Sequence, residues 1–151
     1  MKTKQCLVIG LGRFGGAVAT ELHRLGNRVT AVELDPELAE SYLGRVGRIV
    51  QGDATTVQFP GLAGVLPGFG TQRPNDWGLG FELRDGKSPH WTGSDNSPRT
   101  FGHFGQSGTF LWVDPEADIA LIVLTDRDFG DWTHELWPAI SDGVLREIAA
   151  H

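Results

Sequence analysis

The feature that most constrains this sequence is a short apolar run that leads directly into a group of glycines. Leu7, Val8 and Ile9 form a continuous apolar segment, a pattern typical of a strand buried on both faces of a parallel sheet. Glycines follow at positions 10, 12 and 15, and an amphipathic segment over 14–25 begins among them. A glycine-rich turn between a strand and a helix is typical of a phosphate-binding loop. The run therefore predicts a strand–helix unit with a diphosphate cradle at its turn.

Each of the three glycines has a mechanical task in such a loop. Gly10 allows the tight turn, Gly12 lets backbone amides approach a pyrophosphate, and Gly15 lets the helix pack against the strand. An alternative stays open, in which the glycines serve only turn geometry and packing.

Two further strands and a second helix follow the glycine turn. A strand over 28–32 closes with Glu33, about 20 residues beyond the glycines, where a carboxylate can accept hydrogen bonds from ribose hydroxyls. Asp35 is placed to cap a helix over 36–45, whose first residue is a proline. A third strand over 48–51 then completes a βαβαβ pattern.

Four short runs in this region also carry a family resemblance. They are Val8-Ile9-Gly10-Leu11-Gly12-Arg13-Phe14-Gly15, Glu21-Leu22, Ala31-Val32-Glu33-Leu34-Asp35 and Gly52-Asp53-Ala54-Thr55. Over about residues 4–56 the chain resembles the start of RCK domains, the cytosolic nucleotide-sensing subunits of bacterial Trk and Ktr potassium-uptake systems. The resemblance stops at the third strand, whereas an RCK domain continues with three more strand–helix units that form its dimer surface.

This resemblance implies binding of NAD(H), ATP or ADP. The residues implied around the phosphates are Gly10, Gly12, Arg13, Phe14 and Gly15, with Glu33 on a ribose and Asp53 near the nucleoside.

The chain changes character after residue 56. The segment over 57–75 is rich in glycine and proline and shows neither a helical nor an alternating period, so we interpret it as an irregular join. Beyond it we expect a strand over 77–83, a hairpin of strands over 108–113 and 119–125, and a last helix over 132–150. Pro138 suggests that the regular part of this helix begins near Glu135, so that the proline lies in its first turn.

A second resemblance lies in this C-terminal part, from about Pro60 to the end. It rests on Asp76-Trp77-Gly78-Leu79-Gly80-Phe81, Gly102-His103-Phe104-Gly105-Gln106-Ser107-Gly108 and Trp112-Val113-Asp114-Pro115, followed by residues 120–127 and the closing helix. These residues resemble the C-terminal end of serine hydrolases of the β-lactamase and penicillin-binding-protein superfamily, especially its esterase-like members. The resemblance implies that His103, Phe104 and Gly105 form the third active-site motif and that the amide of Gln106 contributes to the oxyanion hole.

The nucleophile that such enzymes need is absent from this chain. They attack with the serine of a Ser-x-x-Lys motif, assisted by the lysine and by a tyrosine. The lysines are Lys2, Lys4 and Lys87, none of them three residues after a serine, and the one tyrosine, Tyr42, lies in the other segment. We therefore expect no catalytic activity, and we interpret His103, Gly105 and Gln106 as vestigial.

Composition narrows the remaining classes of function. Residues 1–56 carry a formal charge of +1 and residues 57–151 a charge of −7, so no basic stripe suits nucleic acid. No apolar run approaches the roughly 18 residues that span a bilayer, and we expect no membrane insertion. The N-terminus shows no signal peptide and the one cysteine, Cys6, excludes an internal disulfide framework, which favours a cytoplasmic protein. The histidines show no metal-ligand spacing, so no metal is expected.

Together these patterns predict an α/β chimera, engineered or shuffled, that forms one composite domain, with segment swapping as an alternative arrangement. Its parts are a half-Rossmann unit of RCK type over 1–56, the join over 57–75, and β-lactamase-like antiparallel strands plus a helix over 76–151. We expect at most weak nucleotide binding, and self-association, because each segment alone would expose a sheet edge and an apolar face. A natural potassium-transport regulator and a vestigial esterase remain as alternatives.

Overall fold

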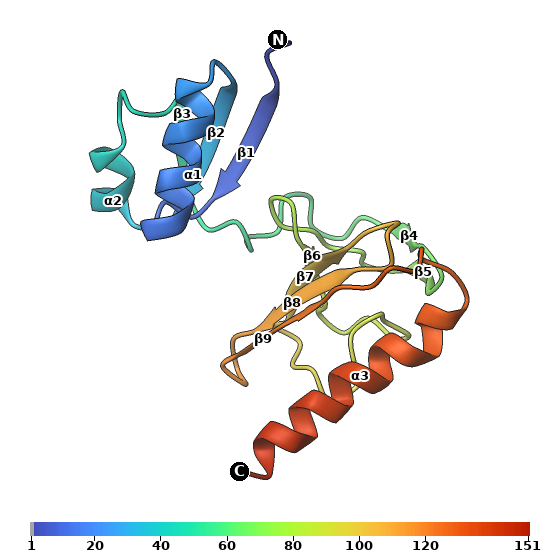
Figure 1. Cartoon of the computed structure of the whole chain (residues 1–151). Helices are drawn as coiled ribbons and strands as arrows, with labels where there is room; N and C mark the ends of the chain where they lie inside the picture. The colour runs from blue at the N-terminus through green and yellow to red at the C-terminus, as the bar shows by residue number, and fades with distance from the viewer. Residues whose placement is uncertain (1) are drawn as a thin grey trace. The chain divides into compact units, whose positions relative to one another are not determined.

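The computed structural model describes residues 2–151, which fall into two compact units with the boundary between Thr56 and Val57. Each unit has a separate hydrophobic core, and Figure 1 shows their elements. The overall class is α/β, as the sequence predicts, with a parallel sheet in the first unit and antiparallel strands with a helix in the second.

The N-terminal unit is a parallel three-stranded sheet in the order β1-β2-β3. Its elements are β1 (Gln5–Ile9), α1 (Arg13–Arg24), β2 (Arg28–Glu33), α2 (Pro36–Ser41) and β3 (Arg48–Gln51). Ile9 pairs with Val32, and Glu33 pairs with Gln51. The carboxyl ends of all three strands therefore lie at one edge of the sheet.

The helices of this unit cover one face of its sheet. The core consists of Leu11, Ala19, Val29, Ala31 and Val46, against which Cys6 and Val8 also pack. The alternate residues of β1, Leu7 and Ile9, point the other way and are 49% and 37% exposed. The prediction that this strand is buried on both faces is thus wrong, because α1 and α2 pack on the same side.

The second helix ends earlier than the sequence suggests. α2 begins as expected, with the Asp35 side chain accepting hydrogen bonds from the amides of Glu37 and Leu38. It ends at Ser41 instead of about residue 45, and the chain passes through turns in which Gly44 has φ +76°. A positive φ at this position is incompatible with a continuing right-handed helix.

The C-terminal unit contains a small hairpin and a four-stranded antiparallel sheet. The hairpin is β4 (Gly64–Leu66) and β5 (Gly70–Gln72); the sheet has the order β6-β7-β8-β9. The sheet strands are β6 (Glu82–Leu83), β7 (Phe101–Phe104), β8 (Phe110–Asp114) and β9 (Ile119–Val123), and α3 (Trp132–Ala149) follows. The segment over 57–75 is thus partly regular, because glycines at positions 68 and 70 adopt the positive φ that its tight turn requires.

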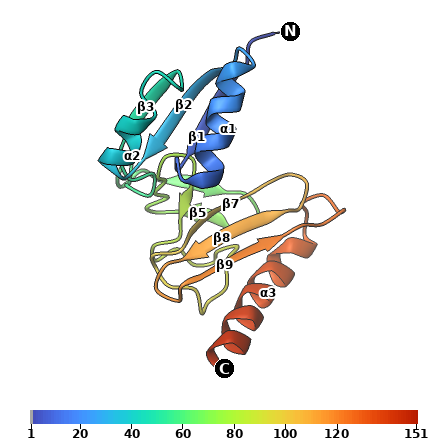
Figure 2. The same ribbon diagram turned by 60° about the vertical axis from the view of Figure 1, so that its left-hand side comes forward.

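Large aromatic side chains join α3 to the sheet. Trp91, Trp112 and Trp137 are fully buried and form the core with Phe110 and Leu145. The Trp112 indole donates to the Ser141 hydroxyl at 3.0 Å, which fixes the helix to the central strand β8. Figure 1 and Figure 2 both show α3 running alongside the sheet.

Two expected boundaries in this unit differ from the structure. The strand expected over 77–83 contracts to β6, joined by an isolated bridge between Trp77 and Glu82. α3 begins at Trp132, as expected, but it is regular from there and contains Pro138 in its interior, whereas the sequence suggested that the regular part begins near Glu135. An interior proline disfavours a helix because it lacks the N–H donor and its ring crowds the preceding turn, and here the buried neighbour Trp137 packs this turn against the core.

A buried carboxylate organises the loop that covers the sheet. Asp114, at the end of β8, is 1% exposed. Its oxygens accept hydrogen bonds from the Ser97 amide and hydroxyl at 2.7 and 2.6 Å and from the Thr100 hydroxyl at 2.9 Å. Burial acts to raise the pKa of Asp114, but the hydrogen bonds from Ser97 and Thr100 outweigh it and hold that pKa below its usual range.

Replacing Asp114 with asparagine should lower the free energy of unfolding of this unit by about 1–3 kcal/mol, because an amide NH₂ would face donors. The stability that the Asp114 carboxylate contributes is fully present above about pH 4 and is lost as the pH falls through its lowered pKa. The free energy of unfolding of the asparagine variant should therefore depend less on pH in the acid range than that of the unchanged protein. Urea unfolding followed by tryptophan fluorescence measures both effects, since all five tryptophans lie after residue 76. Asp118→Asn, an exposed turn residue, is the control, and equal effects of the two changes would contradict the assignment.

Candidate functional site

The parallel sheet brings the predicted binding residues to one edge. The Gly10 amide donates to the Val32 carbonyl at 2.8 Å, and the Gly52 amide donates to the Glu33 carbonyl at 2.9 Å. The glycine turn after β1, the carboxylate at the end of β2 and the turn after β3 are thereby adjacent. In open parallel sheets this edge is where ligands bind.

The three glycines of the turn differ in what requires them. Gly10 has φ +82°, a conformation that side chains rarely adopt. A Cβ on Gly15 would lie 1.9 Å from the Gly10 carbonyl oxygen, so α1 packs on the turn only with glycine there. A Cβ on Gly12 would meet nothing within 4 Å. Turn geometry and packing therefore account for Gly10 and Gly15 but not for Gly12, whose open side is where a phosphate could approach.

The start of α1 supplies donors at the same place. Gly12 is the N-cap residue, no side chain caps the helix, and its first turn contains no acidic residue. The amides of Arg13, Phe14 and Gly15 have no acceptor within the helix. These groups and the helix dipole make the turn suited to an anion. Arg13 and Phe14 are exposed beside it, with Phe14 83% exposed.

Glu33 is nearly buried and its carboxylate faces the turn. Oε2 accepts a hydrogen bond from the Leu11 amide at 2.5 Å, and Oε1 accepts one from the Asp35 amide at 2.9 Å. The side chain thus already has protein partners at the position where the sequence predicts a ribose contact. The glycine pattern does not indicate the part played by Leu11, because a backbone amide leaves no signature in the sequence.

Asp53 lies in the turn that follows β3. Its Oδ1 accepts hydrogen bonds from the amide and the hydroxyl of Thr55, at 2.8 and 2.7 Å. This contact shapes the turn after β3, and the exposed carboxylate stands at the same edge of the sheet as Glu33.

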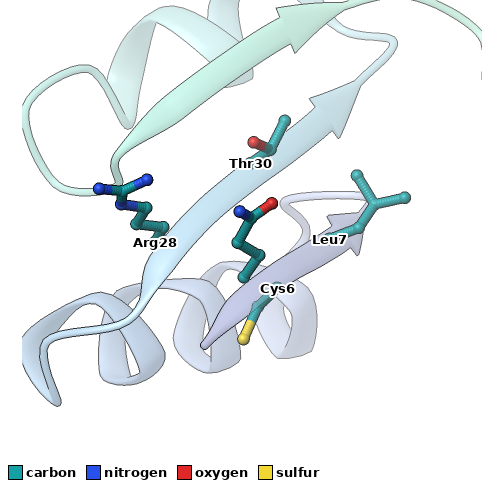
Figure 3. Close-up of a pocket in the computed structure, with 5 residues that line it drawn as sticks. Cys6, Leu7, Arg28 and Thr30 are labelled. Carbon is teal, nitrogen blue, oxygen red and sulfur yellow. The ribbon is translucent and has the colours of Figure 1, made fainter. Parts of the chain in front are cut away.

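A hollow of about 420 Å³ in this unit is not part of the site. It is lined by Gln5, Cys6, Leu7, Arg28 and Thr30 (Figure 3). Gln5 and Arg28 pair at the amino-terminal ends of β1 and β2. The hollow therefore lies at the opposite end of the strands from the glycine turn.

The predicted vestigial residues of the second unit gather in and beside the turn between β7 and β8. His103 is exposed on β7; its Nδ1 lies 2.6 Å from the Phe104 carbonyl oxygen, and its ring meets that of Trp77 edge-on at 5.6 Å. The Gly105 amide donates to the Thr109 carbonyl at 3.0 Å, and the Gln106 carbonyl accepts from the Phe129 amide at 2.8 Å.

The serine nearest to this turn does not pair with a base. Ser107 Oγ lies 3.0 Å from Thr109 Oγ1. Across residues 2–151 no serine hydroxyl is hydrogen-bonded to a histidine: both ring nitrogens of His90, Nδ1 of His103 and Nε2 of His151 have other partners, and the buried Nε2 of His134 has none. The turn thus has an exposed histidine beside it, but not an activated nucleophile.

Residues 2–151 contain neither a cluster of metal ligands nor a helix suited to a bilayer. No group of three or more His, Cys, Asp or Glu side chains in this range is placed to hold a metal ion. None of the helices in this range has the length and apolar character needed to cross a membrane.

Comparison with known proteins gives a different relative for each part of the chain. Residues 6–65 match the model of the TrkA-N domain family. Ktr system potassium uptake protein A of Bacillus subtilis (strain 168) is 46% identical over 55 residues, which are 36% of this chain and 25% of that protein.

A crystal structure of a β-lactamase from Mycobacterium bovis is 79% identical in sequence, with a TM-score of 0.61. The match covers 63% of this chain, more than the first unit alone could supply, and 35% of the β-lactamase chain. Both resemblances predicted from the sequence are confirmed. The chain spans about a quarter of the length of one relative and about a third of the other.

Gly12 lies against open space and Gly15 lies against the Gly10 carbonyl, so replacing each of them with alanine should change the free energy of unfolding by different amounts. Gly12→Ala should lower the free energy of unfolding of the N-terminal unit by no more than about 1 kcal/mol, the usual cost of alanine at a helix N-cap, because its φ of −55° suits alanine and the added methyl group meets nothing within 4 Å. Gly15→Ala should destabilise the unit, because the methyl group would overlap the Gly10 carbonyl. Amide hydrogen exchange across β1–β3 measures both. A loss of stability in Gly12→Ala equal to that in Gly15→Ala would show that packing also requires Gly12.

Proposed function

We propose that the N-terminal unit binds the diphosphate of NAD(H), ADP or ATP at the turn over 10–15, and that the chain is not an enzyme. The single observation that carries the proposal is the open side of Gly12 beside the amides that begin α1. A diphosphate placed there would accept hydrogen bonds from Arg13, Phe14 and Gly15 and complement the helix dipole.

The remaining predicted residues fit the same ligand. Each carboxylate oxygen of Glu33 accepts one amide and keeps a lone pair for a ribose hydroxyl. Asp53 stands at the neighbouring strand end, on the side where a nucleoside would extend. The match of residues 6–65 to the TrkA-N family supports this assignment. β1 is an edge strand of the sheet in this unit. Within residues 2–56 no further strand flanks the glycine turn on that side, and nucleotide binding should therefore be weak.

Titration with NADH or ADP should shift the amide resonances of residues 10–15 in ¹⁵N-labelled protein. Gly12→Ala should abolish these shifts, because its methyl group would occupy the space of the phosphate, while the spectrum of the rest of the unit stays unchanged. Sodium chloride at equal ionic strength controls for a simple salt effect. No shift at about 1 mM nucleotide, which would place any dissociation constant above that range, would refute the proposal.

The absence of catalysis is proposed from the chain's own chemistry. The β-lactamase-like part lacks the Ser-x-x-Lys pair, and Ser107 is hydrogen-bonded to a threonine instead of a base. Without a nucleophile, the Gln106 amide has no developing oxyanion to stabilise. Hydrolysis of a p-nitrophenyl ester that disappears in His103→Ala would overturn this proposal in favour of a vestigial esterase.

We also propose that the chain is a chimera of two unrelated segments, engineered or shuffled. The two relatives, one of the potassium-uptake type and one a β-lactamase, support this origin. A natural regulator of potassium transport is the second candidate, favoured by the 46% identity of its glycine-bearing segment to a potassium uptake protein. A single uninterrupted reading frame across residues 56–76 in genomic DNA would favour that second candidate.

Self-association, in the cytoplasm, is the partner interaction that we propose. Leu7 on β1 and Ile122 on the terminal strand β9 are large apolar side chains about half or more exposed. Pairing or packing with another copy would cover such surfaces. A monomeric mass by light scattering at about 100 μM protein, where even weak dimers populate, would contradict this.

A further inference from the structure

The contact between Glu33 and Leu11 has a role that the ribose assignment does not cover. Leu11 lies between the turn glycines Gly10 and Gly12 and is completely buried. Its amide therefore points inward and needs an acceptor, which is Glu33 Oε2 at 2.5 Å. The other oxygen accepts the Asp35 amide at 2.9 Å. One carboxylate thus joins the glycine turn to the end of β2 and to the start of α2.

The electrostatics of this arrangement require an explanation. A carboxylate beside a phosphate site repels the ligand that the site would hold. Glu33 is 8% exposed and belongs to no ion pair within residues 2–151. The two backbone amides are thus its charge-assisted hydrogen-bond partners. A glutamate that served only to bind the ribose would not need to accept a hydrogen bond from the Leu11 amide.

We propose that Glu33 is a positioning residue, which holds the glycine turn in its diphosphate-binding conformation before any ligand arrives. This inference rests on the proposed nucleotide function of the turn and deepens it. By fixing Leu11, the carboxylate fixes the backbone between Gly10 and Gly12, and with it the open side of Gly12 and the direction of the first α1 amides. The ordering of a glycine-rich segment is thus completed during folding and does not weaken binding.

The first arm of the test needs no ligand. In the full chain, Glu33→Ala removes both acceptors, whereas Glu33→Gln removes the same charge but keeps one acceptor oxygen. Hydrogen exchange of the Leu11 amide should be at least tenfold faster in Glu33→Ala than in the unchanged protein, with Glu33→Gln between them. Glu37→Ala, an exposed carboxylate four residues away, should leave it unchanged. Unaltered Leu11 exchange in Glu33→Ala would overturn the proposal.

The second arm uses inorganic pyrophosphate, which has no ribose. Charge removal alone would affect Glu33→Ala and Glu33→Gln equally, so a pyrophosphate affinity at least threefold weaker in Glu33→Ala than in Glu33→Gln supports positioning. Equal affinities would overturn it, because Glu33 would then act only by its charge or on the ribose. If Glu33→Ala does not fold, Glu33→Asp is compared with the unchanged protein instead, because both carry the charge and the aspartate carboxylate is one methylene short of Leu11; equal pyrophosphate affinities of these two proteins would then overturn the proposal.

The two arms separate this inference from the proposed function. If pyrophosphate binds none of the proteins, including the unchanged chain, the nucleotide function fails. The exchange of the Leu11 amide then decides by itself whether Glu33 holds the turn.

Discussion

The parallel pairing of β1, β2 and β3 is the constraint on which the candidate site depends. It places the ends of three strands at one edge, so that a turn, a buried carboxylate and a second turn meet although about 20 residues separate each from the next. The Gly10 and Gly52 amides extend the ladder beyond the last strand residues. Residues that are distant in sequence thereby share one small region, which is the property that lets such a sheet edge bind a ligand.

The two units use different physical means to hold together. In the first, small residues let helices approach closely: a Cβ on Gly16 would lie 2.0 Å from the Tyr42 hydroxyl, so α1 and the end of α2 meet over a glycine. In the second, three buried tryptophans fill the space between α3 and the sheet. Among the buried polar groups of that unit, Asp114 accepts the hydrogen bonds of Ser97 and Thr100 and so satisfies the loop over 97–100. Each unit therefore has a core of its own.

The residue pattern predicts most of the local elements of both units. The run over 7–9, the glycines and the N-cap of α2 are local signals, and the strand and helices that they predict begin within a few residues of the expected positions. Pro138 was misleading because a helix can lose one amide bond where a buried Trp137 holds the turn. The hairpin over 64–72 was missed because three-residue strands leave no measurable period.

By itself the sequence determined the strand–glycine–helix order, the charge difference between the two parts, and the lack of a Ser-x-x-Lys nucleophile, since these depend only on which residues are neighbours along the chain. Only the tertiary structure decided that Gly12 faces open space while Gly15 is needed for packing. It also decided that Glu33 accepts a hydrogen bond from the Leu11 amide. Such facts depend on distances between segments, and those distances arise only when the strands pair and the helices pack.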